Sequence, residues 1–301
     1  MIENRWNMGS PEVLVLGEAL VDIVETEGGV TEHVGGSPAN VAVGVARLGT
    51  SVRLATRLGR DARGERIARH VRDAGAEIAE GSWTDAATDT ARARIRSDGS
   101  AEYEFAVAGI VPPAPREHAA LVHTGSIALF LDPGGETCLA ALEAARGQAM
   151  VTVDPNIRPA LVGSRETARE RFARAAAAAD LVKLSDEDAA WLWPGAELLS
   201  VLETIARPGA SAVVITRGGD GAIGRARDGA VVEVAGVPVT VADTIGAGDS
   251  FMASLIATLV ERGVPADADT LRHAMGVAAR AAAITVSRPG ANPPTRAELE
   301  G

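Results

Sequence analysis

Short apolar runs alternate along the chain with longer stretches of helical periodicity. The runs lie at residues 13–16, 52–56, 121–124, 150–153, 181–184 and 212–216. Runs of this length with few polar residues are typical of strands that are buried on both faces of a parallel sheet. We therefore predict an α/β protein with a Rossmann-like parallel sheet in a three-layer core.

The stretches between the runs predict helices. Ser37 is a suitable N-terminal cap for a helix that has Pro38 in its first turn and ends before Gly49. Further helices are expected at residues 64–73, 165–179, 250–262 and 271–284. The helix at 250–262 has the clearest pattern, because apolar residues recur there at helical spacing and a glycine follows. Residues 231–241 alternate in the manner of a β-hairpin.

Two segments interrupt this alternation of strand and helix. Residues 18–36 and 88–108 each contain two alternating polar and apolar stretches on either side of a turn, which is the pattern of a β-hairpin. We expect the two hairpins to form a small β-sheet that stands off the main sheet as a lid. The lid is also a candidate homodimer contact. The domain would span residues 11–301, with residues 1–10 as a loose leader.

Composition excludes several classes of function. The net charge is −11 and aromatic residues make up 3% of the chain, which argues against a nucleic-acid partner or an anionic membrane surface. No apolar run is long enough for a membrane span, and Cys138 is the only cysteine, so we expect a cytoplasmic protein without disulfides. Lys183 is the only lysine, which excludes a phosphate loop of the Gly-Lys-Ser/Thr type.

The strongest chemical signal is the segment 243–249, which reads Asp-Thr-Ile-Gly-Ala-Gly-Asp and lies directly ahead of the helix at 250–262. Gly246, Ala247 and Gly248 have almost no side-chain bulk, so their backbone N–H groups can approach an anion at the helix N-terminus. A carboxylate at Asp249 would repel a phosphate group. It is either a favourable charge near the helix dipole or a base that accepts a proton from an attacking hydroxyl group, and the second explanation accounts better for its place.

Other polar candidates follow the predicted strands. They are Asp22, Ser126, residues 154–158 and residues 216–221. Because ligands of an open parallel sheet bind at the carboxyl ends of its strands, these segments predict one binding edge. A dinucleotide-dependent oxidoreductase is disfavoured, because Gly17 is followed by no Gly-x-Gly-x-x-Gly turn.

Two motifs resemble a known family. Residues 35–42, Gly-Gly-Ser-Pro-Ala-Asn-Val-Ala, resemble the first signature of the PfkB (ribokinase-like) carbohydrate kinases, and residues 243–249 resemble the second. Two long motifs in the family's order are far more specific than a lone glycine motif. The resemblance extends over residues 13–294, and the segments 17–22 and 154–158 are most similar to the fructokinases of that family.

The resemblance implies an ATP-dependent sugar kinase. Such an enzyme transfers the γ-phosphate of ATP to a primary hydroxyl group of a small sugar, and fructose is the first expectation here. Ribokinase, 2-keto-3-deoxygluconate kinase and nucleoside kinase activities stay open, as does a relative that binds nucleotide and sugar without catalysis. The implied ligands are ATP, Mg²⁺ and a sugar, and in many relatives also K⁺.

The resemblance also implies roles for single residues. Asp249 matches the catalytic base, and Gly246, Ala247 and Gly248 match the anion hole. The sugar would be bound by Asp22, Gly35, Gly36, Asn40, Arg158 and Asp249. The ATP phosphates would lie along Thr216, Gly218, Gly219, Gly221, Gly246, Gly248 and Ser185. Asp243 and Ile245 match positions that help to bind a monovalent cation.

Two departures from the family pattern change details of this picture. Where many members have Asn-x-x-Glu, this chain has Ser185, Asp186, Glu187 and Asp188. Either Asp188 takes part in Mg²⁺ binding, or the three acidic residues are only the solvated start of a helix. After Asp249, residues 253–254 are Ala-Ser where the family usually has glycine, which should change helix packing slightly.

Overall fold

The computed structural model describes residues 12–26, 28–96, 101–114 and 119–301. The expected leader at residues 1–10 lies outside these ranges. The strands of the main sheet are β1 (Glu12–Leu16), β4 (Ser51–Ala55), β6 (Glu77–Ile78), β10 (Ala119–Gly125), β11 (Met150–Asp154), β12 (Leu181–Ser185), β13 (Ala212–Thr216), β14 (Ala222–Arg225) and β15 (Val231–Val234). All six strands predicted from the apolar runs are confirmed.

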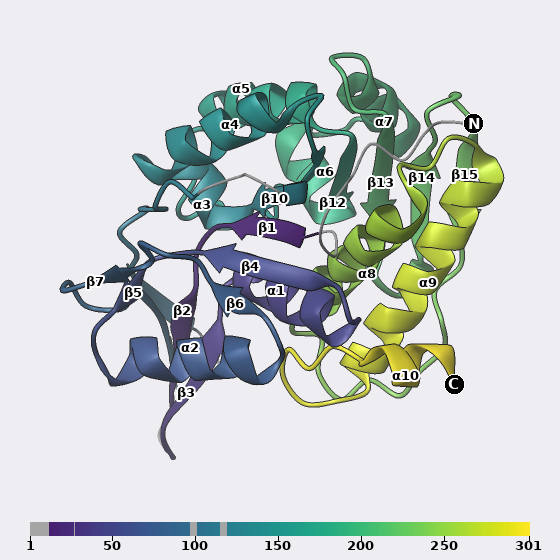
Figure 1. Ribbon diagram of the computed structural model, residues 1–301. Helices are drawn as coiled ribbons and strands as arrows, with labels where there is room; N and C mark the ends of the chain where they lie inside the picture. Colours follow the sequence, from purple (N-terminus) through teal and green to yellow (C-terminus); the bar gives the residue numbers. More distant parts are fainter. Residues whose placement is uncertain (1–11, 27, 97–100, 115–118) are drawn as a thin grey trace.

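The main sheet is parallel over most of its width. Within the described residues it has nine strands in the order β15-β14-β13-β12-β11-β10-β1-β4-β6 (Figure 1). The pairs from β6 to β13 are parallel, whereas β14 and β15 add an antiparallel edge. Since parallel strands need crossover connections, each parallel strand is followed by a helix or by a longer excursion.

Helices cover both faces of this sheet. One face carries α1 (Ser37–Arg47), α2 (Ala62–Asp73), α8 (Ala247–Arg262) and α9 (Ala268–Val286), and α10 (Arg296–Glu300) lies against α9. The other face carries α3 (Ser126–Phe130), α4 (Gly134–Ala145), α5 (Arg165–Ala178), α6 (Asp186–Leu192) and α7 (Leu198–Ala206). Among the described residues, no helix has the length and apolarity that crossing a membrane requires.

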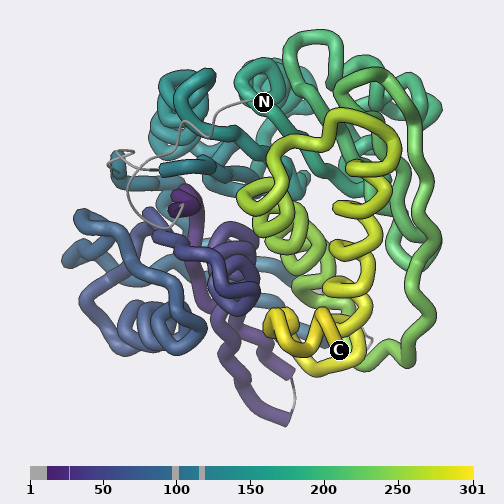
Figure 2. The backbone as a smooth tube through the Cα atoms, turned by 45° about the vertical axis from the view of Figure 1, so that its right-hand side comes forward, coloured from purple at the N-terminus to yellow at the C-terminus, as the bar shows by residue number. Residues whose placement is uncertain are grey.

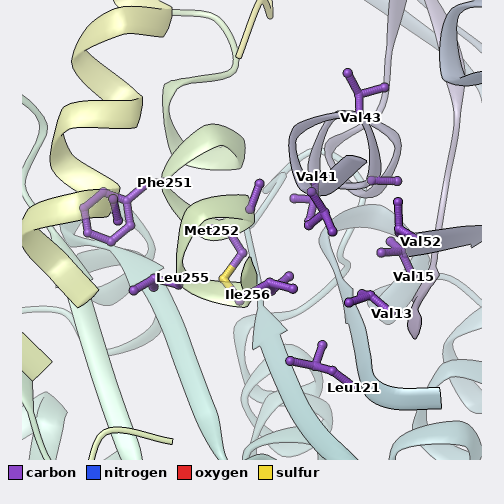
Figure 3. Close-up of a cluster of buried hydrophobic side chains, with 14 of the residues drawn as sticks. Val13, Val15, Val41, Val43, Val52, Leu121, Phe251, Met252, Leu255 and Ile256 are labelled. Carbon is purple, nitrogen blue, oxygen red and sulfur yellow. The ribbon is translucent and has the colours of Figure 1, made fainter. Parts of the chain in front are cut away.

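The side chains of β1 point alternately to the two faces of the sheet, and each face carries its own cluster of core residues. Val13 and Val15 project into the cluster under α1 and α8, and Leu14 and Leu16 project into the cluster under α4 and α5. Successive strand side chains point to opposite faces, so an apolar run fills both clusters at once. Figure 3 shows the first cluster, where side chains of β1, α1 and α8 meet. The predicted three-layer core is confirmed.

The two expected hairpins form a separate sheet, which we call the lid. Its strands are β2 (Leu20–Thr26), β3 (Gly29–Gly35), β8 (Thr90–Ile95) and β9 (Ala101–Ala106). In the described residues their order is β3-β2-β8-β9, with β2 and β8 parallel in the centre. Figure 2 shows the β2–β3 hairpin extending away from the rest of the chain. Between β3 and β8 the chain forms a short parallel pair of strands, β5 (Leu58–Gly59) and β7 (Trp83–Thr84).

Polar contacts fix the lid where it leaves the core. Asp61 caps α2 through the N–H groups of Arg63 and Gly64, and its other oxygen accepts the N–H of Thr88 at 2.9 Å. Arg57 forms an ion pair with Asp89, whose backbone oxygen accepts the N–H of a β2 residue. These contacts tie the base of β8 to the start of α2.

The prediction of a β-hairpin within residues 231–241 is wrong. The hairpin that forms is β14–β15, and residues 235–241 have no regular secondary structure. Pro238 has no N–H to donate to a ladder, so an alternating pattern around it cannot pair as a central strand. The valines that produced the pattern, Val237, Val239 and Val241, are 40%, 38% and 60% exposed.

Candidate active site

The carboxyl ends of four neighbouring strands, β10 to β13, lie along one edge of the main sheet. The register places Gly125 opposite Asp154 and Ser185 opposite Thr216. Ser126 follows β10 directly, with a φ of 54°, and Asn156 follows β11 with a φ of 38°. Left-handed backbone at non-glycine residues is costly and collects at functional sites, so this edge is the first place to look for chemistry.

The N-terminus of α8 lies near this edge, and its first turn is formed by the glycine-rich motif. The helix begins at Ala247, three residues earlier than the pattern at 250–262 predicts. Gly246 is its N-terminal cap with a φ of 77°, and a Cβ at this position would lie 2.6 Å from the Cβ of Ala291. Only glycine fits both the conformation and the space. The first-turn N–H groups, including that of Gly248, lack a helical acceptor of their own, although Ala247 donates to the Thr244 oxygen at 3.3 Å.

Asp249 sits in this first turn and is held by two donors. Its Oδ1 accepts the hydroxyl group of Ser37 at 2.6 Å, and its Oδ2 accepts the amide of Asn40 at 2.8 Å. The side chain is 8% exposed. Each oxygen of the carboxylate therefore has a fixed direction, although the donors lie more than 200 residues earlier in the chain.

The contact with Asp249 corrects the expected role of Ser37. Gly36, with a φ of 102°, is the residue that caps α1, and no side-chain capping hydrogen bond is present there. Glycine is required at this cap because a Cβ would lie 2.6 Å from the backbone oxygen of Glu18. The hydroxyl group of Ser37 is turned instead toward α8.

Close packing of α1 against α8 brings these partners within reach. A Cβ on Gly44 would lie only 2.6 Å from the Cβ of Ala253. Ala253 is one of the two residues that depart from the family's glycines, and the glycine on the facing helix provides the space it needs. The expected small change in helix packing therefore takes the form of an alanine that packs onto Gly44.

The sugar-binding candidates Asp22 and Gly35 lie together in the lid. Asp22 is in β2, and a Cβ on Gly35 would lie 2.0 Å from its Oδ2, so the carboxylate rests on the bare glycine backbone. Burial raises the pKa of Asp22, while the charges of Arg158 and His33 act to lower it. The carboxyl group is thus half-buried and within reach of the charge of Arg158.

Arg158 lies at the end of β11 on the exposed side of the edge. Its guanidinium donates to the side-chain oxygen of Asn156 at 2.7 Å and to two backbone oxygens of the same turn. Its charge acts on both Asp22 and Glu18. The structure thus brings Arg158 near the lid carboxylate, although no direct hydrogen bond joins the two in the described residues.

The loop after β13 forms the other end of the edge. It contains a short 3₁₀ helix, η1 (Gly218–Asp220), and closes with a hydrogen bond from the N–H of Arg217 to the oxygen of Gly221. Gly221 has a φ of 92°, and a Cβ there would lie 2.0 Å from the backbone oxygen of Val234. Thr216, Gly218 and Gly219 lie in this exposed or half-exposed loop, as a phosphate-binding loop requires.

Ser185 and Asp188 form a capping box at the start of α6. The Ser185 hydroxyl accepts the N–H of Asp188 at 3.0 Å, and Asp188 Oδ2 accepts the N–H of Ser185 at 3.1 Å. Asp188 Oδ1 accepts the N–H of Ile157 at 2.7 Å. Asp188 is 6% exposed, so the expectation of a fully solvated helix start is wrong for this residue, whereas Glu187 is exposed.

Asp243 closes the loop ahead of α8. Its two oxygens accept the N–H groups of Ile245 at 3.0 Å and Gly290 at 2.8 Å. These two backbone N–H groups lower the pKa of Asp243. Asp243 therefore holds the loop 243–246 against the segment that follows α9, while the side chain of Ile245 is 59% exposed.

Two buried charged residues at this edge were missed by the sequence reasoning. Lys183 in β12 donates to Asp154 at 2.8 Å, and their side chains are 5% and 1% exposed. Glu18 accepts the N–H of Ala128 at 3.0 Å, and burial raises its pKa to about 7. The available signal was a charged residue within or next to an apolar run, since such a residue is buried only when it has a partner or a function.

The comparison with known proteins identifies a family for this chain. The model of the pfkB family carbohydrate kinases matches residues 10–298. The fructokinase of Klebsiella pneumoniae is 34% identical, over 93% of this chain and 94% of its own length.

Solved structures agree with this result. The fructokinase of Xylella fastidiosa with bound ATP has a TM-score of 0.84 and 27% identity, and the match covers 97% of this chain and 98% of that chain. A doubly substituted fructokinase of Vibrio cholerae O395, with fructose, ADP and potassium ion bound, has a TM-score of 0.81 and 25% identity, with 98% of both chains covered.

The buried Glu18 predicts a pH dependence of stability. Its pKa is about 7 in the folded protein against a usual value of 4.5. The folded state therefore binds the extra proton between these values, and the free energy of unfolding falls as the pH rises through this window, by about 3 kcal/mol. Glu18→Gln removes this loss. In urea unfolding, the free energy of unfolding of the variant relative to that of wild type should rise by about 3 kcal/mol between about pH 5 and about pH 8.

Glu170→Gln, at an exposed position of α5, is the matched control. Its difference from wild type in the free energy of unfolding should be the same at both pH values, because position 170 is in contact with water in the folded as well as in the unfolded chain. A pH-independent effect of Glu18→Gln would show that Glu18 is ionised in the folded protein.

Proposed function

The chain belongs to the pfkB family of carbohydrate kinases, and we propose that its sugar substrate is fructose, phosphorylated by ATP at a primary hydroxyl group. It is a sugar phosphotransferase, and the ATP-bound relative supports ATP as the donor. The observation that carries the site assignment is the pair of hydrogen bonds that hold Asp249 in the first turn of α8. The choice of fructose rests on the named relatives.

The chemistry of phosphoryl transfer explains why this turn suits the reaction. The transferred group needs little covalent help, so catalysis consists mainly of alignment and of stabilising spread negative charge. We assign the charge stabilisation to the backbone of Gly246, Ala247 and Gly248, at the positive end of α8. Asp249 lies in the same turn, so a hydroxyl group that it deprotonates is already beside the phosphoryl group.

Asp249 is the proposed general base. Ser37 and Asn40 hold its two oxygens in fixed directions, which leaves the remaining lone pairs to accept the proton of the sugar hydroxyl group. The Asn40 amide uses one N–H for Asp249 and has a second N–H and a carbonyl oxygen with which to contact the sugar. The proton leaves the hydroxyl oxygen as that oxygen bonds to phosphorus and the bond to the ADP oxygen breaks.

We assign the rest of the sugar site to Asp22, Gly35, Gly36 and Arg158. Asp22 accepts sugar hydroxyl groups from the lid side, and the missing side chain of Gly35 provides the space that its carboxylate occupies. Arg158, whose charge already acts on Asp22, contacts the sugar from the core side. Closure of the lid over the sugar would exclude water and limit hydrolysis of ATP.

The nucleotide phosphates are assigned to the loop 216–221 and to Ser185 at the neighbouring strand end. We assign Asp188 a structural role at the start of α6, because each of its oxygens accepts a backbone N–H group and the residue is 6% exposed. Within the described residues no group of three His, Cys, Asp or Glu side chains could hold a metal ion. We therefore propose that Mg²⁺ arrives with the phosphates of ATP, as is common for this ion.

Asp243 and Ile245 are proposed to form part of a K⁺ site. The Asp243 carboxylate fixes the loop by accepting two N–H groups, which leaves backbone oxygens of the same loop as the natural ligands of a large monovalent cation. The relative with potassium ion bound supports this assignment.

The lid is also the proposed homodimer contact. On the face that carries Asp22, Tyr103 and Phe105 stack with ring centroids 6.3 Å apart, and Tyr103 is 64% exposed. An exposed aromatic pair on a thin sheet is typical of a surface that a second chain covers.

An assay of ADP release over a panel of sugars tests the function. With MgATP, fructose should give the highest kcat/KM among fructose, ribose, 2-keto-3-deoxygluconate and a nucleoside, because the segments 17–22 and 154–158 and the named relatives point to it. Replacing Na⁺ by K⁺ at constant ionic strength should raise the rate. A higher kcat/KM for another member of the panel would replace fructose, and an absence of turnover on all of them would contradict the kinase assignment.

Replacing the proposed base tests the mechanism. Asp249→Asn keeps the shape of the side chain but cannot accept the proton, so kcat should fall by about 10²- to 10⁴-fold. Binding of fructose and of ATP, measured by calorimetry, should stay close to wild type. Asp269→Asn in the first turn of α9, where the side chain is 94% exposed, is the matched control and should leave kcat unchanged. Wild-type turnover by Asp249→Asn would remove this residue as the base.

A further inference from the structure

Lys183 is an unusual residue for this chain. The sequence has 29 basic residues other than histidine, and Lys183 is the only lysine among them. It is 4% exposed and lies in β12, where Leu181, Val182 and Leu184 are fully buried. An ammonium group in such surroundings costs free energy unless nearby charges compensate for its lost hydration.

The compensating charges are three buried carboxylates. Asp154 accepts from Lys183 Nζ at 2.8 Å, and Asp188 and Asp249 act on Lys183 electrostatically. Burial acts to lower the pKa of Lys183, but these carboxylates outweigh it and the pKa is raised. Lys183 is therefore a permanent positive charge among carboxylates that are 1%, 6% and 8% exposed.

The ammonium group also lies against the anion-binding turn. A Cβ built on Gly248 would be 3.1 Å from Lys183 Nζ, so the first turn of α8 rests directly on the charge. The turn that is to receive a phosphoryl group would otherwise face three carboxylates and no cation from this strand. Lys183 thus places one positive charge directly against Gly248, among the negative charges of the three carboxylates.

A purely structural ion pair is the alternative explanation. Buried pairs such as Lys183–Asp154 often contribute little net stability, and breaking one costs much more than removing both charges. The pair alone does not explain the contact with Gly248 or the action of Lys183 on Asp249. It also does not explain why the second oxygen of Asp154, Oδ1, is buried without a hydrogen-bond partner in the described part of the chain.

We propose that Lys183 is a positioning residue for phosphoryl transfer. Through Gly248 and Asp249 it provides the positive charge that lets the first turn of α8 accept the phosphoryl group beside the catalytic base. Lys183 is buried beneath the turn and acts without touching the substrate. This inference rests on the proposed kinase function and adds a residue that lies outside both family motifs.

Two variants separate this role from a structural one. Lys183→Met removes the ammonium group at similar length, and Lys183→Met/Asp154→Asn removes both charges of the pair. We expect kcat to fall by about 10²-fold or more in both variants, while the fructose Kd changes little. The acid limb of kcat/KM should move to higher pH in Lys183→Met, because losing the cation favours the neutral form of the remaining carboxyl groups, and should move less in the double variant, which also loses the negative charge of Asp154.

The double variant decides the question, because it keeps the buried charge balanced and should fold even where the single variant does not. Circular dichroism and urea unfolding confirm the fold of each protein. A folded double variant with wild-type kcat would show that Lys183 serves only to neutralise Asp154, and would overturn the proposal.

The single lysine permits a second test that does not depend on turnover. In protein grown with ¹⁵Nζ-labelled lysine, one side-chain ammonium resonance is expected, and adding MgADP should shift it because the nucleotide phosphates approach the turn above it. Fructose alone should shift it much less. A resonance that does not respond to MgADP, in protein that binds MgADP by calorimetry, would contradict the proposal.

The two tests also distinguish this inference from the proposed function. If wild type turns over no sugar, the kinase assignment fails, and the nucleotide-induced shift of the Lys183 resonance still tests the charge beneath the turn. If wild type is active and the double variant is equally active, the kinase assignment stands and the role of Lys183 fails.

Discussion

The carboxylate of Asp249 at the positive end of α8 is the feature on which the site depends. Its orientation comes from Ser37 and Asn40 on α1, so the distance between two helices determines where the base points. That distance is set by Gly44, which has no side chain and lies against Ala253. Helix packing, which usually serves only stability, here places a donor pair within 3 Å of a reacting group.

Several carboxylates are buried at the same edge of the sheet, and each needs a partner that compensates for its charge. Asp249, Asp154 and Asp188 are all buried near the turn that we propose as the binding site of the phosphoryl group. Backbone N–H groups satisfy Asp188, and Lys183 satisfies Asp154. Neither carboxylate uses the backbone N–H groups in the first turn of α8, so these donors stay available to a ligand.

Much of the fold follows from periodicity alone. The apolar runs indicated the strands and hence both core clusters, because each run fills two faces. The lid followed from alternation around turns. The expected hairpin at 231–241 failed because exposed valines around Pro238 imitate a strand pattern, whereas β14 is four residues long and contains Gly224.

The site was only partly within reach of the sequence. Short motifs with fixed backbone requirements, such as Gly246 and Gly36, could be placed because glycine is needed for their conformation. The hydroxyl group of Ser37 could not, since local capping rules favoured a different role and its real partner lies 212 residues away. Lys183 was visible as a lysine in an apolar run, but its partner is on the neighbouring strand and its closeness to Gly248 depends on how α8 packs on the sheet.

The division between lid and core has a consequence for how such an enzyme discriminates among sugars. Asp249 and Gly248 belong to a helix packed into the core, whereas Asp22 and Gly35 belong to a thin sheet joined to the core through contacts such as Arg57–Asp89 and Asp61–Thr88. If the lid closes over the sugar as proposed, its contacts form only in the closed state, so they select the sugar without altering the position of the proposed base. On this proposal the core residues around Asp249 determine the reaction, and the lid residues determine the choice of sugar.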